Sequence, residues 1–173
     1  MRRGTMYLLA LAAAWGLANP SLIRADDLPR EAVLPLASAS KAAGAALEKC
    51  TRDGYRVSVA VVDRAGLLRM LIRGDGAGPH TIDSSTKKAY TAASLRRPTS
   101  ELADMITKVP ALHSLRDMNE KVLMLGGGLP IEIGSEVVGA IGVGGAPGAH
   151  LDDACAQAGL DSIGATPKLS GGK

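Results

Sequence analysis

The chain has 173 residues, of which 46% are hydrophobic but only 2% are aromatic, with one tryptophan and no phenylalanine. Its formal net charge of +3 arises from 20 basic and 17 acidic residues. Three of the basic residues, Arg2, Arg3 and Arg24, precede Asp26, so the chain from residue 26 onward has a formal net charge of zero. A neutral surface nearly free of aromatic rings excludes nucleic-acid binding, which needs a basic footprint and rings on which bases stack.

The first 25 residues have the pattern of a secretory signal peptide. Two arginines precede an apolar run at residues 8–18, which is shorter than the roughly 20 residues that cross a membrane. Cleavage after Ala25 and cleavage after Ala18 both remain open, and an uncleaved anchor is the alternative. We expect the mature protein to be secreted or periplasmic, without a stable membrane span. The predicted parts are a signal peptide at 1–25, one domain at 26–163 and a disordered tail at 164–173.

The first half of the domain predicts a helix followed by a β-hairpin. Apolar residues at helical spacing run from Leu36 to about Arg52, and Gly54 ends the helix. Alternating valines at 57–62 and an apolar run at 67–73 then predict two strands, joined by a turn in which Asp63 fixes the backbone.

The next segment, RGDGAGPH at residues 73–80, joins this hairpin to a second helix. A phosphate-binding glycine loop belongs in a βαβ unit, and the tripeptide Arg73-Gly74-Asp75 is too short to indicate an adhesion motif. Three glycines let a backbone approach a ligand closely, so we interpret the segment as the rim of a ligand pocket. The helix begins near Thr81, and Pro98 separates it from a further helix at 100–108.

The second half predicts mainly β-structure. Residues 109–121 are expected to be irregular, and Gly159 is expected to close a last helix that begins near His150. Gly134-Ser135 fits a two-residue turn between two strands. The predicted strands are 122–125, 129–133 and 137–143. Five strands joined mainly by tight hairpins predict an α+β fold, in which helices pack on the faces of an antiparallel five-stranded sheet.

The two cysteines, Cys50 and Cys155, leave two interpretations open. In an oxidising compartment they would form a disulfide between the first and last helices, if these helices are neighbours. Alternatively, both are buried thiols that pack as small hydrophobic groups.

Four segments, in order, resemble the GlcG/HbpS family of small haem-binding proteins, which is also found as the carboxy-terminal domain of PduO-type proteins. The resemblance covers roughly residues 33–163. Its segments are VSVAVVDRAGLLRMLIRGDGAG (57–78), KKAYTAASLRRPTS (87–100), GGGLPIEI (126–133) and VVGAIGVGGAPGAHLDDACAQAGL (137–160).

The resemblance implies a profilin-like fold, assembly into homo-oligomers such as octamers, and binding of haem or iron. Exported members of the family are similar to haem scavengers that degrade haem oxidatively, act in oxidative stress and influence a sensor kinase. No catalytic triad appears, so haem degradation would rest on peroxide acting at bound iron. A GlcG-like role as a non-haem small-molecule binding or sensor-accessory module is the alternative function, and an iron-sequestering assembly is a third.

The candidate iron ligands lie near the glycine-rich segment. His80 is the first choice, because the neighbouring glycines admit a flat macrocycle, and His113 is the second. The resemblance also implies weak ligation by a threonine hydroxyl, for which Thr81 and Thr91 are the candidates. For each of these residues the ordinary alternative is a capping or surface role.

The haem propionates would need cationic partners. Arg73, Lys87 and Lys88 are the candidates, and a solvated helix face is their ordinary alternative. We therefore predict a haem site formed by His80, Thr81, Thr91, Arg73, Lys87, Lys88 and His113, with His80 and Thr91 as the metal ligands.

Overall fold

A computed structural model of the chain describes residues 23–166. Most of the predicted signal peptide (residues 1–22) and most of the predicted tail (residues 167–173) lie outside the described residues. The chain divides into two units, Met1–Glu31 and Ala32–Lys173. The described part of the first unit, residues 23–31, is exposed throughout and contains a short 3-10 helix, η1 (Ala25–Asp27).

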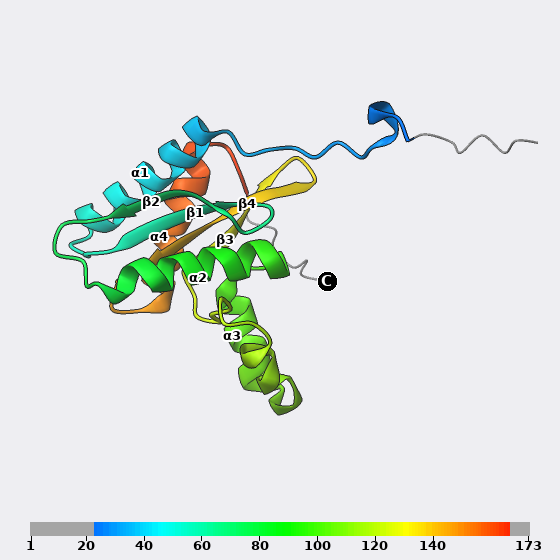
Figure 1. Cartoon of the computed structure of the whole chain (residues 1–173). Helices are drawn as coiled ribbons and strands as arrows, with labels where there is room; N and C mark the ends of the chain where they lie inside the picture. The colour runs from blue at the N-terminus through cyan, green and yellow to red at the C-terminus, as the bar shows by residue number, and fades with distance from the viewer. Residues whose placement is uncertain (1–22, 167–173) are drawn as a thin grey trace, which may run out of the picture. The chain divides into compact units, whose positions relative to one another are not determined.

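The second unit alternates helices and β-hairpins along the chain (Figure 1). No helix in residues 23–166 is both long enough and apolar enough to cross a membrane. The elements are α1 (Leu36–Arg52), β1 (Ser58–Asp63), β2 (Leu68–Arg73), α2 (His80–Leu95), α3 (Thr99–Lys108), η2 (Pro110–Asp117), β3 (Gly128–Ile133), β4 (Glu136–Gly144) and α4 (Ala149–Ser162).

The strands form one antiparallel sheet in the order β2-β1-β4-β3. The two hairpins therefore meet through β1 and β4, which pair from Ser58↔Gly144 to Asp63↔Gly139. The turns follow the sequence signals, since Asp63 Oδ1 accepts hydrogen bonds from two backbone N–H groups of its turn and Gly134 has a φ of 64°. The antiparallel α+β class is confirmed.

The sheet has four strands in the described residues, so the predicted five-stranded sheet is wrong. Residues 122–125 form no strand, because their backbone groups are used elsewhere. The Leu123 N–H donates to the Thr91 hydroxyl at 2.8 Å, and the Leu125 N–H donates to the Leu123 carbonyl at 3.0 Å. An apolar run without a neighbouring strand to pair with remains a loop.

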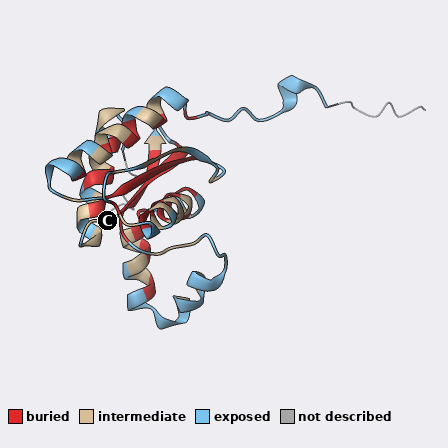
Figure 2. Cartoon of the chain, turned by 60° about the vertical axis from the view of Figure 1, so that its left-hand side comes forward, coloured by how far each residue is buried: buried red, intermediate tan, exposed pale blue. Residues whose placement is uncertain are grey.

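Helices cover both faces of the sheet, and Figure 2 shows the two central strands, β1 and β4, buried between them. We call the side covered by α1 and α4 the disulfide face, because Cys50 of α1 and Cys155 of α4 form a disulfide with a Cα–Cα distance of 5.5 Å. This result decides between the two interpretations of the cysteines. The main hydrophobic core lies here and includes Val59, Val61 and Ile141.

The opposite side, which we call the α2 face, is covered mainly by α2. Its apolar cluster is small and consists largely of alanines, with Val62 as its only larger buried member. Close approach of the backbone makes this packing feasible. A Cβ atom at Gly142 of β4 would lie 2.1 Å from the carbonyl oxygen of Ser85 in α2, so only glycine fits there.

Three further details differ from the predicted boundaries. Residues 110–117, expected to be irregular, form the 3-10 helix η2. Gly159 lies inside α4 rather than at its end, where a Cβ atom would be 2.8 Å from the Ala42 carbonyl of α1. Thr166, assigned to the tail, exchanges two backbone hydrogen bonds of 3.2 Å with Glu132.

Candidate functional site

Five of the seven predicted site residues lie on α2, while Arg73 ends β2 and His113 lies on η2. His80 is the first residue of α2 and Thr91 lies 11 residues further along the same helix. At a rise of 1.5 Å per residue these positions are about 16 Å apart along the helix axis. His80 and Thr91 are therefore alternative ligands and cannot bind one iron together.

Both candidate threonines are buried, and their hydroxyls are engaged. Thr81 Oγ1 donates to the Gly78 carbonyl at 2.6 Å and lies 2.7 Å from the Ser58 hydroxyl of β1. Thr91 Oγ1 donates to the Lys87 carbonyl and accepts from the Leu123 N–H, both at 2.8 Å. These contacts tie α2 to β1 and to the segment after η2, which gives the two hydroxyls structural roles.

The histidines are more accessible. His80 is exposed, and its ring lies against Gly78, where a Cβ atom would be 2.6 Å from His80 Cε1. His113 is exposed on η2. Among the predicted iron ligands, the two imidazoles are the donors that can reach a bound molecule without breaking a described hydrogen bond.

The predicted propionate partners also differ in how accessible their charged groups are. Arg73 folds back on its own loop, where its guanidinium donates to the Ala77 carbonyl, with Nε at 2.9 Å. Lys87 is partly exposed and lies 3.3 Å from the Asp83 carboxylate, an ion pair along one helix face. Lys88 is buried, with only 2% of its side chain exposed, so its ammonium does not reach the surface.

Lys88 instead forms a buried ion pair that the sequence analysis missed. Its Nζ donates to Asp152 Oδ2 at 2.8 Å and to the Val143 carbonyl at 2.9 Å, which joins α2 to α4 and to the end of β4. Burial raises the pKa of the Asp152 carboxyl, although the Lys88 ammonium opposes this shift. The signal was present in the helical spacing, since Lys88 shares a stripe with Ser85 and Ala92, both of which are buried.

The neighbouring Asp153 anchors the glycine turn that precedes β3. Its Oδ1 accepts a hydrogen bond from the Gly127 N–H at 2.6 Å. Burial raises the pKa of the Asp153 carboxyl, and hydrogen bonds from Gly127 and the Ser100 side chain act in the opposite direction. Asp152 and Asp153 therefore stabilise the fold beyond the helix-dipole role that their positions at the start of α4 indicate.

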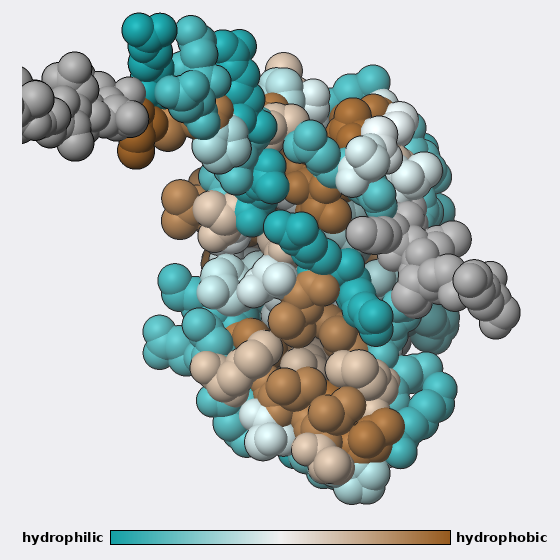
Figure 3. Space-filling view, turned by 90° about the vertical axis from the view of Figure 1, so that its right-hand side faces the viewer, coloured by the Kyte–Doolittle hydropathy of each residue, from teal (hydrophilic) through white to brown (hydrophobic). Residues whose placement is uncertain are grey.

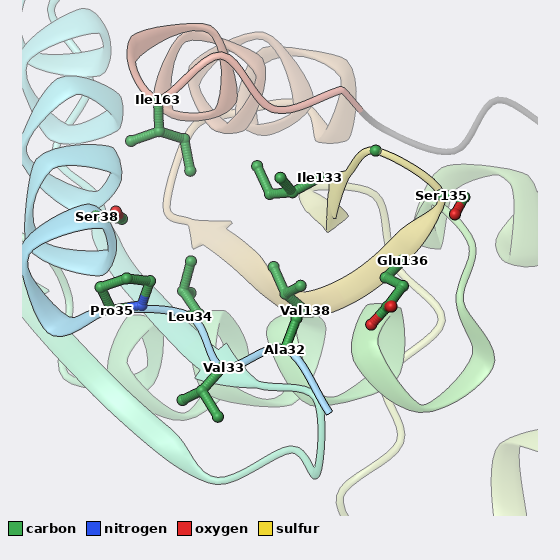
Figure 4. A pocket seen from close by; sticks show the side chains of 11 residues that line it. Ala32, Val33, Leu34, Pro35, Ser38, Ile133, Ser135, Glu136, Val138 and Ile163 are labelled. Carbon is green, nitrogen blue, oxygen red and sulfur yellow. The ribbon is translucent and has the colours of Figure 1, made fainter. Parts of the chain in front are cut away.

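Four cavities are described in the second unit, and none is lined by any of the seven predicted site residues. The largest, of about 490 Å³, lies beside the tip of the β3–β4 hairpin, and we call it the hairpin cavity. Figure 4 shows the side chains of Leu34, Ile133 and Val138 around it. Glu136 is its only charged lining residue, a charge that repels haem propionates.

A second cavity, of about 400 Å³, lies between the end of α1 and the β2–α2 loop, and we call it the loop cavity. Gly74 and Asp75 of the RGDGAGPH segment line it. The segment is therefore part of a cavity wall, but this cavity contains none of the predicted iron ligands.

An exposed apolar surface lies in residues 99–125, the segment that contains α3, η2 and the residues that follow them. In Figure 3, apolar side chains gather on the lower part of the visible face, at the height at which Figure 1 draws these helices. Val109, Met118 and Leu125 are the large exposed hydrophobic residues of this segment, which also carries His113. Within residues 23–166, no group of three or more His, Cys, Asp or Glu side chains is arranged to hold a metal ion.

Comparison with known proteins decides the family. A family model described as "haem degrading protein HbpS-like" matches residues 34–161. The chain belongs to the HbpS-like family. The match covers the sheet, its helices and every predicted site residue of this HbpS-like chain, which confirms the resemblance of its four segments.

Solved structures and a curated relative agree with this family. The crystal structure of a double mutant of HbpS from Streptomyces reticuli is 44% identical, with a TM-score of 0.75 over 84% of this chain and 97% of that one. The structure of a PduOC–haem complex is 25% identical, with a TM-score of 0.74 over 80% of this chain and 100% of that one. Protein GlcG of Escherichia coli K12 is 34% identical over 115 residues, 62% of this chain and 77% of GlcG.

Proposed function

We propose that this HbpS-like protein binds haem. The observation that carries the proposal is the match of residues 34–161 to a family described as haem-degrading. The solved PduOC–haem complex supports it, because that chain has the same fold along its full length.

His80 is the proposed iron ligand. Its imidazole is exposed at the start of α2 and lies against Gly78, where the absence of a side chain leaves room for the ring. Lys87 lies on the same helix, and its partly exposed ammonium would pair with a propionate in place of Asp83. Bound haem would supply the redox chemistry, while the chain would hold the iron and orient the macrocycle.

His113 is the competing ligand within the same function. It lies on η2, in the segment whose exposed hydrophobic residues would cover one face of a macrocycle. The two imidazoles are on different elements, so separate substitutions distinguish them.

A haemin titration followed at the Soret band tests the proposal. We expect saturable binding, and we expect His80→Ala to weaken it at least about tenfold if the imidazole supplies the ligand bond. His113→Ala tests the competing ligand. His150→Ala is the matched control, because His150 is also exposed near the start of a helix but is not a predicted ligand. No saturable Soret shift with the unmodified protein would overturn haem binding.

The proposal extends to haem degradation, export, assembly and a protein partner. We propose that bound haem is degraded oxidatively and its iron retained, which a loss of Soret absorbance on addition of peroxide would report. We propose that the signal-peptide pattern at residues 1–25 exports the protein. We also propose, from the family resemblance, that the protein assembles into homo-oligomers and contacts a sensor kinase.

Non-haem small-molecule binding is the second candidate function, and the hairpin cavity favours it. This cavity has a mainly apolar lining, contains none of the predicted iron ligands and has the size of a small-molecule site. Enhanced fluorescence of the neutral dye Nile red, lost in Val138→Trp, would support this function if the haemin titration fails.

A further inference from the structure

The loop cavity combines an apolar floor with two opposite charges, none of which belongs to the proposed haem site. Its walls come from two parts of the chain, the end of α1 with the residues that follow it and the loop after β2. Leu47 and Tyr55 pack on the main core and provide an apolar floor, while Arg56 and Asp75 bring opposite charges to the rim.

Both walls of the loop cavity are held in place. The disulfide fixes Cys50 in the last turn of α1, and the Tyr55 N–H donates to the Cys50 carbonyl at 2.8 Å. On the other wall, the Gly74 N–H donates to the Val57 carbonyl at 2.9 Å. A cavity with fixed walls binds a small ligand without a large cost in ordering the chain.

The loop wall packs closely at two glycines. A Cβ atom at Gly74 would lie 3.0 Å from the Val57 carbonyl oxygen and 3.1 Å from Leu47 Cδ1. Gly76 has a φ of 73°, and a Cβ atom there would lie 3.0 Å from Arg56 Cδ. The glycines therefore bring the loop close to β1 and leave room for the Arg56 side chain across it.

The two rim charges differ from the charges around them. Arg52 pairs with Glu48 at 2.9 Å, and Lys49 pairs with Asp53. In the described part of the chain, Arg56 and Asp75 form no ion pair or side-chain hydrogen bond, and both are exposed. A guanidinium and a carboxylate that are both unpaired at one rim are complementary to a ligand that carries a carboxylate and an ammonium group.

We propose that the loop cavity binds a small zwitterion with an apolar side chain, the chemical class of the apolar α-amino acids. The ligand carboxylate pairs with the Arg56 guanidinium, the ligand ammonium pairs with Asp75, and the side chain rests on Leu47 and Tyr55. This site is separate from the proposed haem ligands, because neither His80 nor His113 lines the cavity.

Isothermal titration calorimetry of the purified protein with L-alanine, L-valine and L-leucine tests the proposal. We expect saturable binding of L-leucine, and at least about tenfold weaker binding of 4-methylpentanoate, which lacks the ammonium group, and of 3-methylbutylamine, which lacks the carboxylate. No saturable binding of any of the three amino acids, or equal binding of L-leucine and its two analogues, would overturn the proposal.

Two rim variants and one control assign the site. Arg56→Gln and Asp75→Asn are each expected to weaken L-leucine binding about three- to tenfold, since each removes one exposed charge pair. Arg52→Gln is the control, because Arg52 is exposed nearby but does not line the cavity. Unchanged affinity in both rim variants would place the ligand elsewhere and refute the assignment. The readout does not involve haem, so its result is independent of the haemin titration.

Discussion

The two faces of the sheet are stabilised in different ways. On the disulfide face, aliphatic side chains from three strands pack against α1 and α4, and a covalent bond joins these helices. On the α2 face, a few alanines and Val62 bury little apolar area, and polar contacts of Thr81, Thr91 and Lys88 hold the helix in place.

This difference explains why the predicted ligand residues gather on the α2 face while few of them are free to bind. A helix that packs through alanine and glycine approaches its sheet closely, so it gains little from the hydrophobic effect and depends on buried hydrogen bonds. Three residues that make these bonds, Thr81, Thr91 and Lys88, are among those predicted to bind haem. We therefore expect substitutions that remove the buried polar side chains of the α2 face to destabilise the protein more than substitutions elsewhere.

The largest expected effect is the loss of the buried ion pair on the α2 face. Lys88→Met leaves the Asp152 carboxylate buried without its partner, and we expect the free energy of unfolding to fall by about 3–5 kcal/mol. Urea denaturation measures this change. The double variant Lys88→Met/Asp152→Asn should be more stable than Lys88→Met alone, because no unpaired charge remains.

Lys87→Met is the matched control, since Lys87 is the adjacent residue and pairs only at the surface. We expect a change of less than about 1 kcal/mol for it. Equal losses in the Lys87 and Lys88 variants would contradict the role assigned to the buried pair.

Removal of the covalent link on the opposite face should have the next largest effect. The Cys50–Cys155 disulfide spans 105 residues, and replacement of both cysteines by alanine is expected to lower the free energy of unfolding by about 2–4 kcal/mol. A reductant should destabilise the unmodified protein by a similar amount and leave the double variant unchanged. A reductant that alters both proteins equally would show that the disulfide is not the cause.

The smallest expected effect is a pH dependence that arises from Asp153. Burial raises the pKa of this carboxyl, so the folded state holds its proton more tightly than the unfolded state does. The stability that this proton contributes is present below the ordinary aspartate pKa of about 3.9 and is lost as the pH rises through the raised pKa.

Thermal unfolding of Asp153→Asn between about pH 3 and pH 6 measures this contribution. We expect the stability of the unmodified protein relative to the variant to fall by less than about 1 kcal/mol as the pH rises, because Asp153 is only partly buried. A difference that grows in favour of the unmodified protein would reverse the assigned direction of the pKa shift.

The sequence predicted the elements whose signals are local. The helix from Leu36 to Arg52 and the turns at Asp63 and Gly134 follow from spacing and turn chemistry within a few residues. The strand expected at 122–125 failed because a strand needs a partner, and the Leu123 N–H finds the Thr91 hydroxyl instead. The local pattern at Gly159 predicts a helix end, but the contact of α4 with α1 is what requires this glycine, and no local pattern reveals that contact.

Prediction of the candidate site from the sequence is limited in the same way, because contacts between distant residues decide it. The sequence placed Thr81, Thr91 and Lys88 on one helix correctly, but the partners that engage these side chains come from distant residues. Lys88 and Asp152 are 64 positions apart, and their pairing depends on where the sheet places α2 and α4. The accessibility of His80 likewise follows from the fold, because spacing alone does not distinguish a capping histidine from a free one.

The pairing of β1 with β4 also determines the order in which the chain can fold. Ser58 pairs with Gly144, so the two central strands come together only after the ribosome has released most of the chain. Until then the first hairpin lacks its neighbour in the sheet, and α2 lacks the glycines of β4 on which it rests. The four-stranded sheet is therefore completed only when synthesis of the chain is nearly complete.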